Sequence, residues 1–309
     1  MTGWLIVNEY LNNEKFKELQ DLFLDAATKK NVELRAYTNA EFVVDYETGE
    51  AFSEAFIEGR PDFVIFYDKD ISLAVALEGM GLEVFNCAAA IETCDSKALT
   101  AECVCIYNQN QDDKSEEITV PLTFKVPFTY ENIGIKKDAD FRFLDYIEDK
   151  LESAYPMIIK ESYSSFGMGV HLAHSRDEAI DILCEVGNRE CVIQEFVEGT
   201  AGRDVRLQMV GDEVAAAMMR TNDHDFRSNI TNGGCMSKYE PTEADIELAR
   251  KVMRCLSLDF AGIDIMHDEA GNPIFIEANS NAHFKNLYDL TGINVTEKMI
   301  DYIASVVSE

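Results

Sequence analysis

Asp264, Glu277 and Asn279 bring two carboxylates and one carboxamide into a short stretch of the sequence. Two carboxylates that face each other repel, and a divalent cation between them would turn that repulsion into binding. Three hard oxygen donors are the ligands that magnesium and manganese prefer. Such ions usually bind proteins together with phosphates. We therefore predict a magnesium or manganese site at these residues, and ATP chemistry next to it.

Two apolar runs must hold these side chains in place. Residues 260–267 and 274–278 predict a pair of strands, and the Asp-Glu-Ala-Gly-Asn-Pro stretch between them predicts the connecting loop. If His267 lies opposite Ile274, the antiparallel register places the two carboxylates directly opposite each other. The carboxamide follows the second carboxylate by two residues, so it shares the same face of the sheet.

A glycine-containing loop, S-Y-S-S-F-G-M-G at 162–169, lies between two predicted strands. The backbone at Gly167 and Gly169 would let N–H groups approach an anion closely, and the hydroxyls of Ser164 and Ser165 would add donors. The loop is not a Walker A sequence, because it lacks GK[ST] and a strand rather than a helix follows it. An ordinary glycine-rich hairpin turn is the alternative.

Two lysines precede this loop. Lys160 ends the strand that enters it, and Lys97 begins an earlier helical region. A lysine beside a phosphate loop can neutralise ATP oxygens as a point charge. A solvated surface lysine is the alternative for each.

After the loop, residues 194–198 follow an apolar strand and could offer backbone groups to adenine and a carboxylate to ribose. An ordinary strand end is the alternative.

Arginines gather beside the acidic hairpin, although the protein is acidic overall. Asp204 and Arg206 share one face of a predicted strand start, Arg220 ends the next strand, and Arg227 and Asn229 precede two glycines. Such arginines could bind a transferring phosphoryl group and an anionic substrate. Scattered surface salt bridges, which contribute little stability, are the alternative. Their position next to the hairpin favours a functional role.

The composition excludes several classes of protein. The chain has 309 residues, 47% of them hydrophobic, which fits a globular protein with two or three modules. Its 57 acidic and 27 basic residues give a net charge of −30, which argues against a nucleic-acid surface. The start has no basic leader, and no stretch is long enough to span a membrane. We expect no membrane partner and a cytoplasmic location.

The eight cysteines lack CxxC spacing, and the five histidines show no metal-ligand spacing. Buried free thiols in a reducing compartment are therefore expected.

Three regions follow one another along the chain, and we place them at 1–92, 93–196 and 197–309. The first alternates predicted strands and helices, which indicates a small parallel α/β sheet. Its predicted strands are 4–7, 32–37, 63–67 and 83–85, and its helices are 14–30 and 71–80. The second has predicted helices 95–105, 141–153 and 177–186, and strands 154–160, 170–173 and 191–196. The third adds strands 205–210 and 213–220, helix 243–257 with Thr242 as its N-cap, and a final helix 297–307 starting at Thr296.

The ordered set of motifs resembles the ATP-grasp superfamily, and within it the RimK-like carboxylate–amine ligases. In chain order the motifs are C-D-S-K, M-I-I-K, S-S-F-G-M-G-V, V-I-Q-E-F-V-E-G, R-D-V-R, F-R-S-N-I with G-G, A-G-I-D and F-I-E-A-N-S-N. Each motif alone is weak, and the ordered set is strong. The similarity is close over 93–309, whereas the first ninety residues resemble the family's pre-ATP-grasp domain only in outline.

The resemblance implies a fold and a role for each matched residue. The fold is α/β, in the α+β form of ATP-grasp: a parallel α/β domain followed by two subdomains that grip ATP between them. Lys97, Lys160 and loop 164–169 would contact the phosphates. Glu195 and Val197 would meet adenine through the backbone. The remaining implied roles are Glu198 for ribose, Asp204 for the cofactor, Asp264, Glu277 and Asn279 for two magnesium ions, and Arg206, Arg220, Arg227 and Asn229 for the γ-phosphate, the acyl phosphate or the acceptor.

The implied reaction joins an amino acid, with L-glutamate expected, to a carboxylate acceptor that is a small molecule or the C-terminus of a peptide or protein. Positioning and charge neutralisation would suffice, without a protein nucleophile. Homo-oligomers are common in the family, so a homo-oligomer is expected for this chain by analogy only.

Two departures keep other functions open. Family members commonly carry S-P-G after the metal-binding asparagine, where this chain has Ser280-Asn281-Ala282-His283-Phe284. The stretch 106–130 is also longer and more polar than usual. A nucleotide-binding regulatory or scaffold protein that lost ligase chemistry is one alternative. An ATP-grasp ligase for a different amino acid or a peptide is another.

Overall fold

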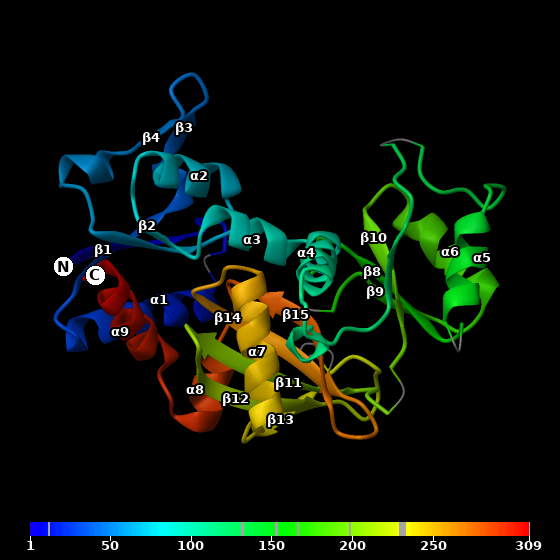
Figure 1. Ribbon diagram of the computed structural model, residues 1–309. Coiled ribbons are helices and arrows are strands. Elements are labelled where there is room, and N and C mark those ends of the chain that lie inside the picture. The colour runs from blue at the N-terminus through cyan, green and yellow to red at the C-terminus, as the bar shows by residue number, and fades with distance from the viewer. Residues whose placement is uncertain are drawn as a thin grey trace.

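The computed structural model describes residues 1–11, 13–130, 133–151, 154–165, 167–197, 199–228 and 233–308. In this part of the chain the strands form three main sheets, in the order of the three predicted regions, and one small hairpin. Figure 1 shows the first sheet at the left, the second at the right, and the third between and below them. This mixed α/β architecture confirms the predicted fold class. The domain boundaries at residues 92 and 196 stay a proposal.

The first sheet is parallel and has the strand order β2-β1-β5-β6. Its strands are β1 (Thr2–Val7), β2 (Glu33–Thr38), β5 (Phe63–Tyr67) and β6 (Val84–Phe85). The central strand β5 reads FVIFY and is buried throughout, because strands of a parallel sheet are covered on both faces. Helices α1 (Glu14–Lys29) and α2 (Ile71–Gly79) begin at the capping side chains of Asn13 and Asp70. The predicted strand–helix alternation is therefore confirmed.

Some elements near this sheet differ from the prediction. A hairpin of β3 (Val43–Asp45) and β4 (Glu50–Phe52) was not expected from the sequence. The predicted helix 95–105 is confirmed over residues 97–105, but its start is wrong, because two helices meet there: α3 (Ala88–Asp95) and α4 (Lys97–Gln109). The backbone of Ser96 is extended, and its side chain accepts a hydrogen bond from the Leu99 amide, so Ser96 caps a new helix. Short 3-10 turns lie at Asn39–Glu41, Glu54–Ile57 and Lys114–Glu116.

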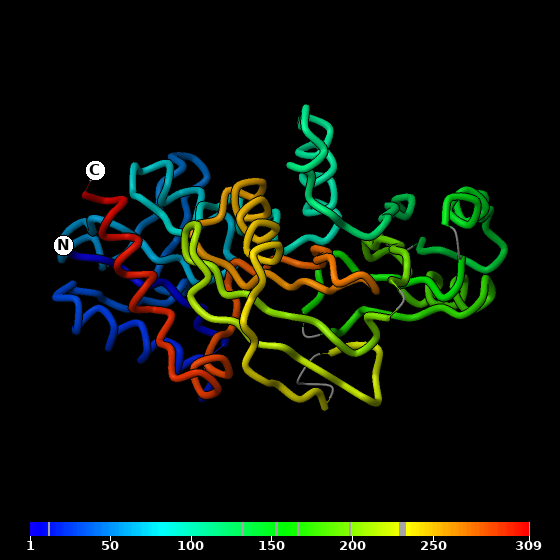
Figure 2. The backbone as a smooth tube through the Cα atoms, turned by 60° about the horizontal axis from the view of Figure 1, so that its bottom comes forward, coloured from blue at the N-terminus to red at the C-terminus, as the bar shows by residue number. Residues whose placement is uncertain are grey.

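The second sheet is antiparallel and has the order β7-β10-β8-β9. Its strands are β7 (Thr123–Lys125), β8 (Met157–Glu161), β9 (Val170–Ala173) and β10 (Cys191–Glu195). Helices α5 (Arg142–Lys150) and α6 (Arg176–Val186) share a core with it, through residues such as Leu144, Leu183 and Ile193. In Figures 1 and 2 this unit lies at the end of the molecule far from both termini. The loop 162–169 connects β8 to β9, as predicted.

The third sheet is antiparallel, with the order β13-β12-β11-β14-β15. Its strands are β11 (Arg203–Val210), β12 (Glu213–Thr221), β13 (Cys235–Lys238), β14 (Phe260–His267) and β15 (Pro273–Asn279). Helix α7 (Glu243–Cys255) packs on one face of the sheet (Figure 1). Its N-cap is Thr242, as predicted, and Asp245 completes a capping box.

The register of the β14–β15 hairpin confirms one prediction and corrects another. Asp264 lies opposite Glu277, as expected. However, His267 lies opposite Pro273 rather than Ile274, because the register shifts between Asp264 and Ile265. A β-bulge therefore adds one residue to β15 between the loop and the acidic pair.

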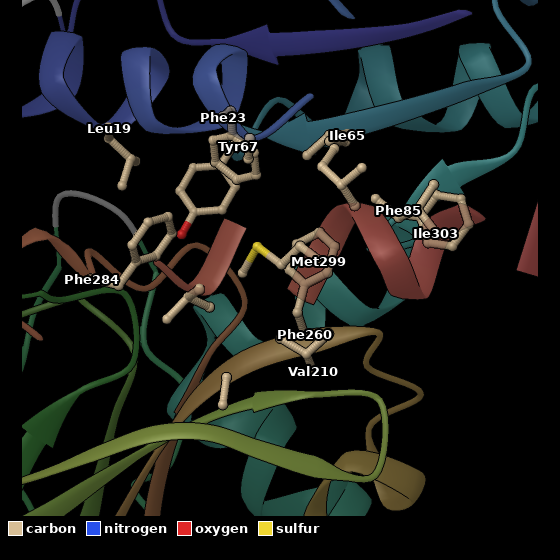
Figure 3. Packing of buried hydrophobic residues seen from close by; sticks show 14 of the residues in the cluster. Leu19, Phe23, Ile65, Tyr67, Phe85, Val210, Phe260, Phe284, Met299 and Ile303 are labelled. Atoms are coloured by element: carbon tan, nitrogen blue, oxygen red, sulfur yellow. The ribbon is translucent and has the colours of Figure 1, made fainter. Parts of the chain in front are cut away.

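The C-terminal helices attach the first unit to the third sheet. Helix α8 (Lys285–Thr291) is followed by α9 (Val295–Val307), which Asn294 caps, so the predicted start at Thr296 is wrong. Figure 3 shows Phe23 and Tyr67 of the first unit, Phe260 of β14, and Phe284 and Met299 of the C-terminal segment in one core. The two termini consequently lie close together (Figures 1 and 2).

The cysteines are free, as predicted, but most of them are not buried. Only Cys94 and Cys191 are buried, whereas Cys105 and Cys235 are exposed and the other four are intermediate. The prediction of buried thiols is therefore wrong for these six cysteines. No helix within the described residues is both long and apolar enough to cross a membrane.

Candidate active site

The polar residues of the third sheet follow from strand periodicity. Alternate residues of β11 and β14, including Val205, Leu207 and Ile263, pack in the core beneath α7. The residues between them must point to the opposite face. That face carries Asp204, Arg206, Arg220, Asp264 and Glu277, which are register partners across four strands.

Asp264 is bound by two arginines. Its Oδ1 and Oδ2 accept hydrogen bonds from Arg206 Nε at 2.6 Å and Arg206 Nη2 at 2.5 Å, and Arg220 Nη2 lies 2.9 Å from Oδ2. Asp264 is 4% exposed. Burial favours the neutral form, but the charges of the two guanidiniums outweigh it and lower the pKa of Asp264.

Arg220 also binds Asp204, through Nε and Nη2, each 2.6 Å from a carboxylate oxygen. Ser228 Oγ donates to the same carboxylate. Burial by itself would lower the pKa of Arg220, but the negative charges of Asp264 and Asp204 raise it by a larger amount. The net pKa is raised, so the guanidinium stays protonated. Asp204 therefore holds Arg220 in place. Because its carboxylate oxygens are already bound by Arg220 and Ser228, the side chain is not free to make the predicted contact with the cofactor.

The three predicted metal ligands differ in how accessible they are. The Glu277 side chain is 33% exposed, and its closest cation is Lys97 Nζ at 3.7 Å. Asn279 Nδ2 is buried without a hydrogen-bond partner among the described residues. Asp264 was expected to face an open cation site, but its hydrogen bonds with arginine leave about one lone-pair position free.

This donor set still fits a hard divalent cation. It offers an accessible carboxylate, the carboxamide of Asn279, whose oxygen rather than its nitrogen would bind the cation, and one remaining carboxylate lone pair. The described residues contain no group of three or more His, Cys, Asp or Glu side chains placed to hold a metal. Two carboxylates and one carboxamide are consistent with that absence. The number of ions stays a prediction.

Lys97 connects the acidic hairpin to the glycine loop. Its Nζ donates to the Ser164 carbonyl at 2.8 Å and to Ser164 Oγ at 3.3 Å, and it lies next to Glu277. Its amide donates to the Ser162 carbonyl at 3.1 Å. The sequence predicted that Lys97 begins a helical region, and the structure confirms this, because Lys97 is the first residue of α4 and reaches both sites from there.

Lys160 lies at the end of β8 and donates to Gln194 Oε1 at 2.6 Å. Burial lowers the pKa of its ammonium group to about 8, and the nearby Lys97 charge acts in the same direction while Glu277 opposes it. A pKa this low means that the surroundings of Lys160 supply too little negative charge to stabilise the protonated ammonium group fully. A phosphate group would supply that charge.

We expect the pH dependence of ATP use to report Lys160. Because the ammonium group loses its proton above a pKa of about 8, kcat/KM for ATP should fall about tenfold per pH unit above that value. A Lys160→Arg variant keeps its charge and should show no such fall below about pH 10. Initial rates between pH 6.5 and 10 provide the measurement. An identical decline in the variant would contradict the assignment.

The glycine loop touches the segment between β12 and β13 through Arg227. Gly167 and Gly169 have positive φ values of 74° and 68°, which favour glycine. Arg227 Nη1 donates to the Gly167 carbonyl at 3.0 Å, while its Nη2 pairs with Asp225 at 2.7 Å. The Met168 amide donates to the Ser165 carbonyl at 3.1 Å, which closes a turn. The structure thus brings Arg227 to the loop.

The segment predicted to bind adenine is partly occupied. The Glu195 amide donates to the Leu122 carbonyl at 2.9 Å, and the Glu195 carboxylate accepts from the Leu122 amide at 2.9 Å. Thr200 Oγ1 donates to the Val197 carbonyl at 2.6 Å. An adenine edge would therefore use other backbone groups of this segment. Two further predicted residues, Glu198 and Asn229, lie outside the described residues.

The segment 280–284, where the family pattern breaks, packs against the first unit. Asn281 Nδ2 donates to the Asp68 carbonyl at 2.7 Å, and Tyr67 Oη donates to the Ala282 carbonyl at 2.5 Å. Phe284 is buried in the core shared with α1. The departure therefore has a packing role, and it does not by itself indicate lost chemistry.

Comparison with known proteins decides the family. The model of the RimK-like ATP-grasp domain matches residues 112–303. The chain belongs to the RimK-like ATP-grasp family. Ligases of the ATP-grasp fold use ATP to form C–N bonds, so the protein is an ATP-dependent carboxylate–amine ligase.

Two relatives show how far the similarity extends. An uncharacterised protein of Mycoplasma pneumoniae is 27% identical over 262 residues, 84% of each chain. The ribosomal protein bS6–L-glutamate ligase of Escherichia fergusonii is 36% identical over 151 residues, which are 48% of this chain and 50% of that protein. The higher identity is thus confined to half of each chain.

Solved structures of similar fold cover nearly the whole chain. The RimK domain ATP-grasp protein of Sphaerobacter thermophilus aligns with a TM-score of 0.67 and 16% identity, over 98% of this chain and 100% of that one. The ATP-grasp ligase PsnB, complexed with a phosphomimetic variant of its minimal precursor, Mg and ADP, aligns with a TM-score of 0.68 and 12% identity, over 99% and 98%. These similarities establish the ATP-grasp fold for all three sheets.

Sequence reasoning missed residues that position the family motifs. Gln194 holds Lys160, and Ser228 holds Asp204. Gln208 is 1% exposed, and its Oε1 has no partner among the described residues. Gln208 stands two residues after Arg206, so its place on the polar face was readable from strand alternation.

Proposed function

We propose that the protein joins an amino acid, with L-glutamate as the first candidate, to a carboxylate acceptor through an acyl phosphate. The convergence of Lys97, Lys160 and the glycine loop with Glu277 carries this proposal. Lys97 contacts both the loop and Glu277, so phosphate contacts and the proposed metal ligands lie at one place.

In the first step, a substrate carboxylate oxygen attacks the γ-phosphorus of ATP, and the bond from that phosphorus to the β-phosphate oxygen breaks. ADP leaves, and an acyl phosphate remains. In the second step, the amine nitrogen of the amino acid attacks the acyl carbon. Phosphate then leaves with the former carboxylate oxygen, and the amine gives up its proton to form the amide.

The chain would contribute positive charge and positioning to these steps. Lys97 and Lys160 would neutralise phosphate oxygens, and the loop backbone would enclose them. Arg227, which touches the loop, and Arg206, which pairs with Asp264, would meet the transferring phosphoryl group or the acceptor. Glu277, Asn279 and the free lone pair of Asp264 would hold magnesium, which screens phosphate charge when bound.

The proposed acceptor follows from the names of similar proteins. The bS6–L-glutamate ligase name refers to a protein acceptor and L-glutamate, and another PsnB structure is a complex with the precursor peptide PsnA2. We therefore propose a peptide or protein C-terminus as the first acceptor to test, ahead of a small molecule.

Product analysis tests the proposed chemistry. Incubation with ATP, magnesium, L-glutamate and peptides that end in glutamate should release ADP and phosphate. Hydroxylamine added in place of the amino acid should give a hydroxamate, because it traps acyl phosphates. Release of AMP and pyrophosphate would refute the proposal. The matched control omits the peptide carboxylate by amidating its C-terminus and glutamate side chain.

A further inference from the structure

A cleft of about 510 Å³ opens beside the glycine loop. Its lining includes Ser164, Ser165 and Gly169 of the loop and Glu161 of β8, whose carboxylate pairs with Arg189 at 3.0 Å. The lining also includes Lys69, just after β5 of the first sheet, and Asp95, the last residue of α3. The proposed phosphate loop and a pair of opposite charges therefore line the same open cleft.

Lys69 and Asp95 form an ion pair that remains accessible to solvent. Their side chains are 46% and 29% exposed. An exposed pair of this kind contributes little stability, so a ligand can separate it at low cost. Because each side chain would then meet the opposite charge of the ligand, no buried charge is left without a partner.

The pair lies in the same region as Glu277. Asp95 stands two residues before Lys97, whose Nζ lies 3.7 Å from Glu277 Oε1. Helix α3, which ends at Asp95, also contacts β15, which carries Glu277. The ion pair is therefore close in the fold to the proposed metal ligand as well as to the loop.

The position of Lys69 is fixed by the segment that departs from the family pattern. Asn281 holds the carbonyl of Asp68, and Ala282 accepts the hydroxyl of Tyr67, so both residues before Lys69 are held. The Asp68 carboxylate then accepts from the Lys69 amide at 2.7 Å. Residues 280–284 therefore position the turn that presents Lys69 to the cleft.

We propose that Lys69 and Asp95 form the subsite for the amino-acid substrate, in which Lys69 binds the α-carboxylate and Asp95 binds the α-ammonium group. This inference rests on the proposed ligase function. A free α-amino acid is a zwitterion, and it would replace the ion pair with two charge-assisted hydrogen bonds. Its nitrogen would then lie between Asp95 and the phosphate loop, where the acyl phosphate must form.

The subsite is tested by changing one charge at a time on the protein and on the ligand. The protein loaded with magnesium and a non-hydrolysable ATP analogue is titrated calorimetrically with L-glutamate. L-Isoglutamine, whose α-carboxylate is an amide, and N-acetyl-L-glutamate, whose ammonium is masked, are titrated in parallel. The variants are Lys69→Met and Asp95→Asn. Lys29→Met, which opens the surface pair with Glu297, is the matched control.

The unchanged protein should bind L-glutamate at least about tenfold more tightly than either analogue, because each analogue loses one charged hydrogen bond. Lys69→Met should weaken L-glutamate binding and abolish the preference over L-isoglutamine. Asp95→Asn should abolish the preference over N-acetyl-L-glutamate. The control should match the unchanged protein.

Retention of both preferences in the two variants would overturn the subsite. So would a lack of binding by L-glutamate and by every other proteinogenic amino acid. These outcomes are separate from failure of the ligase proposal, because hydroxamate formation requires no amino-acid amine. A protein that forms hydroxamate but keeps both preferences would retain its function and lose this subsite.

Discussion

Glu277→Gln is expected to lower kcat by about 1,000-fold while the fold survives. The substitution keeps the shape of the side chain and removes the accessible carboxylate proposed to hold magnesium beside Lys97. Loss of a single group that stabilises transition-state charge typically lowers kcat by about 100- to 1,000-fold. Because the side chain is 33% exposed and lies outside the apolar cores, the thermal midpoint should change little.

The measurement is ADP release at saturating ATP, magnesium and substrates, alongside a thermal unfolding curve. Glu297→Gln is the control: it neutralises a carboxylate on α9 that pairs with Lys29 of α1, and it should leave the rate unchanged. A Glu277→Gln enzyme with full activity would eliminate the metal assignment. A large loss of stability would show that the residue supports the fold instead.

Arg220→Met should lower the free energy of unfolding by about 3–5 kcal/mol, the range observed when one member of a buried ion pair is removed. Arg220 is 5% exposed and binds two carboxylates, Asp204 and Asp264. The methionine fills much of the volume, so the loss arises from the carboxylates left without that charge. Urea denaturation at pH 8 provides the measurement, with Lys30→Met, in the exposed pair with Asp301, as the control.

The pH dependence of this loss has a defined sign. In the unchanged protein the pKa of Asp264 is depressed, so its pairing stabilises the fold above about pH 4 and that contribution is lost as the pH falls through the folded pKa. Without Arg220, burial should raise that pKa, and Asp264 should become neutral at a higher pH. The difference between the two proteins should therefore shrink on going from pH 8 to pH 5. An equal difference at both values would contradict the buried-charge explanation.

Much of the site follows from local pattern. Apolar alternation predicted β14 and β15, and the placement of Asp264 opposite Glu277 is confirmed. The assumed partner of His267 is nevertheless wrong, because a β-bulge adds one residue to β15. The bulge depends on the pairing of the two strands, and the apolar sequence pattern of β15 does not reveal it. The motif order was sufficient to predict the family and the fold.

Other features depend on contacts between residues far apart in the sequence. Pairing across two strands determines that Arg206 and Arg220 occupy the Asp264 carboxylate, and strand periodicity alone cannot reveal it. Lys69 and Asp95 come from different elements and share no motif. The break between α3 and α4 was missed because Ser96 acts as a cap only in an extended conformation.

The central claim is that a substrate carboxylate accepts the γ-phosphoryl group. It is tested most directly with peptides that end in glutamate and carry ¹⁸O in their carboxylates, incubated with ATP, magnesium and L-glutamate. One ¹⁸O atom should appear in the released phosphate for each amide bond formed, because the acyl phosphate carries the carboxylate oxygen away. Label in AMP, or amide formation with unlabelled phosphate, would contradict the account.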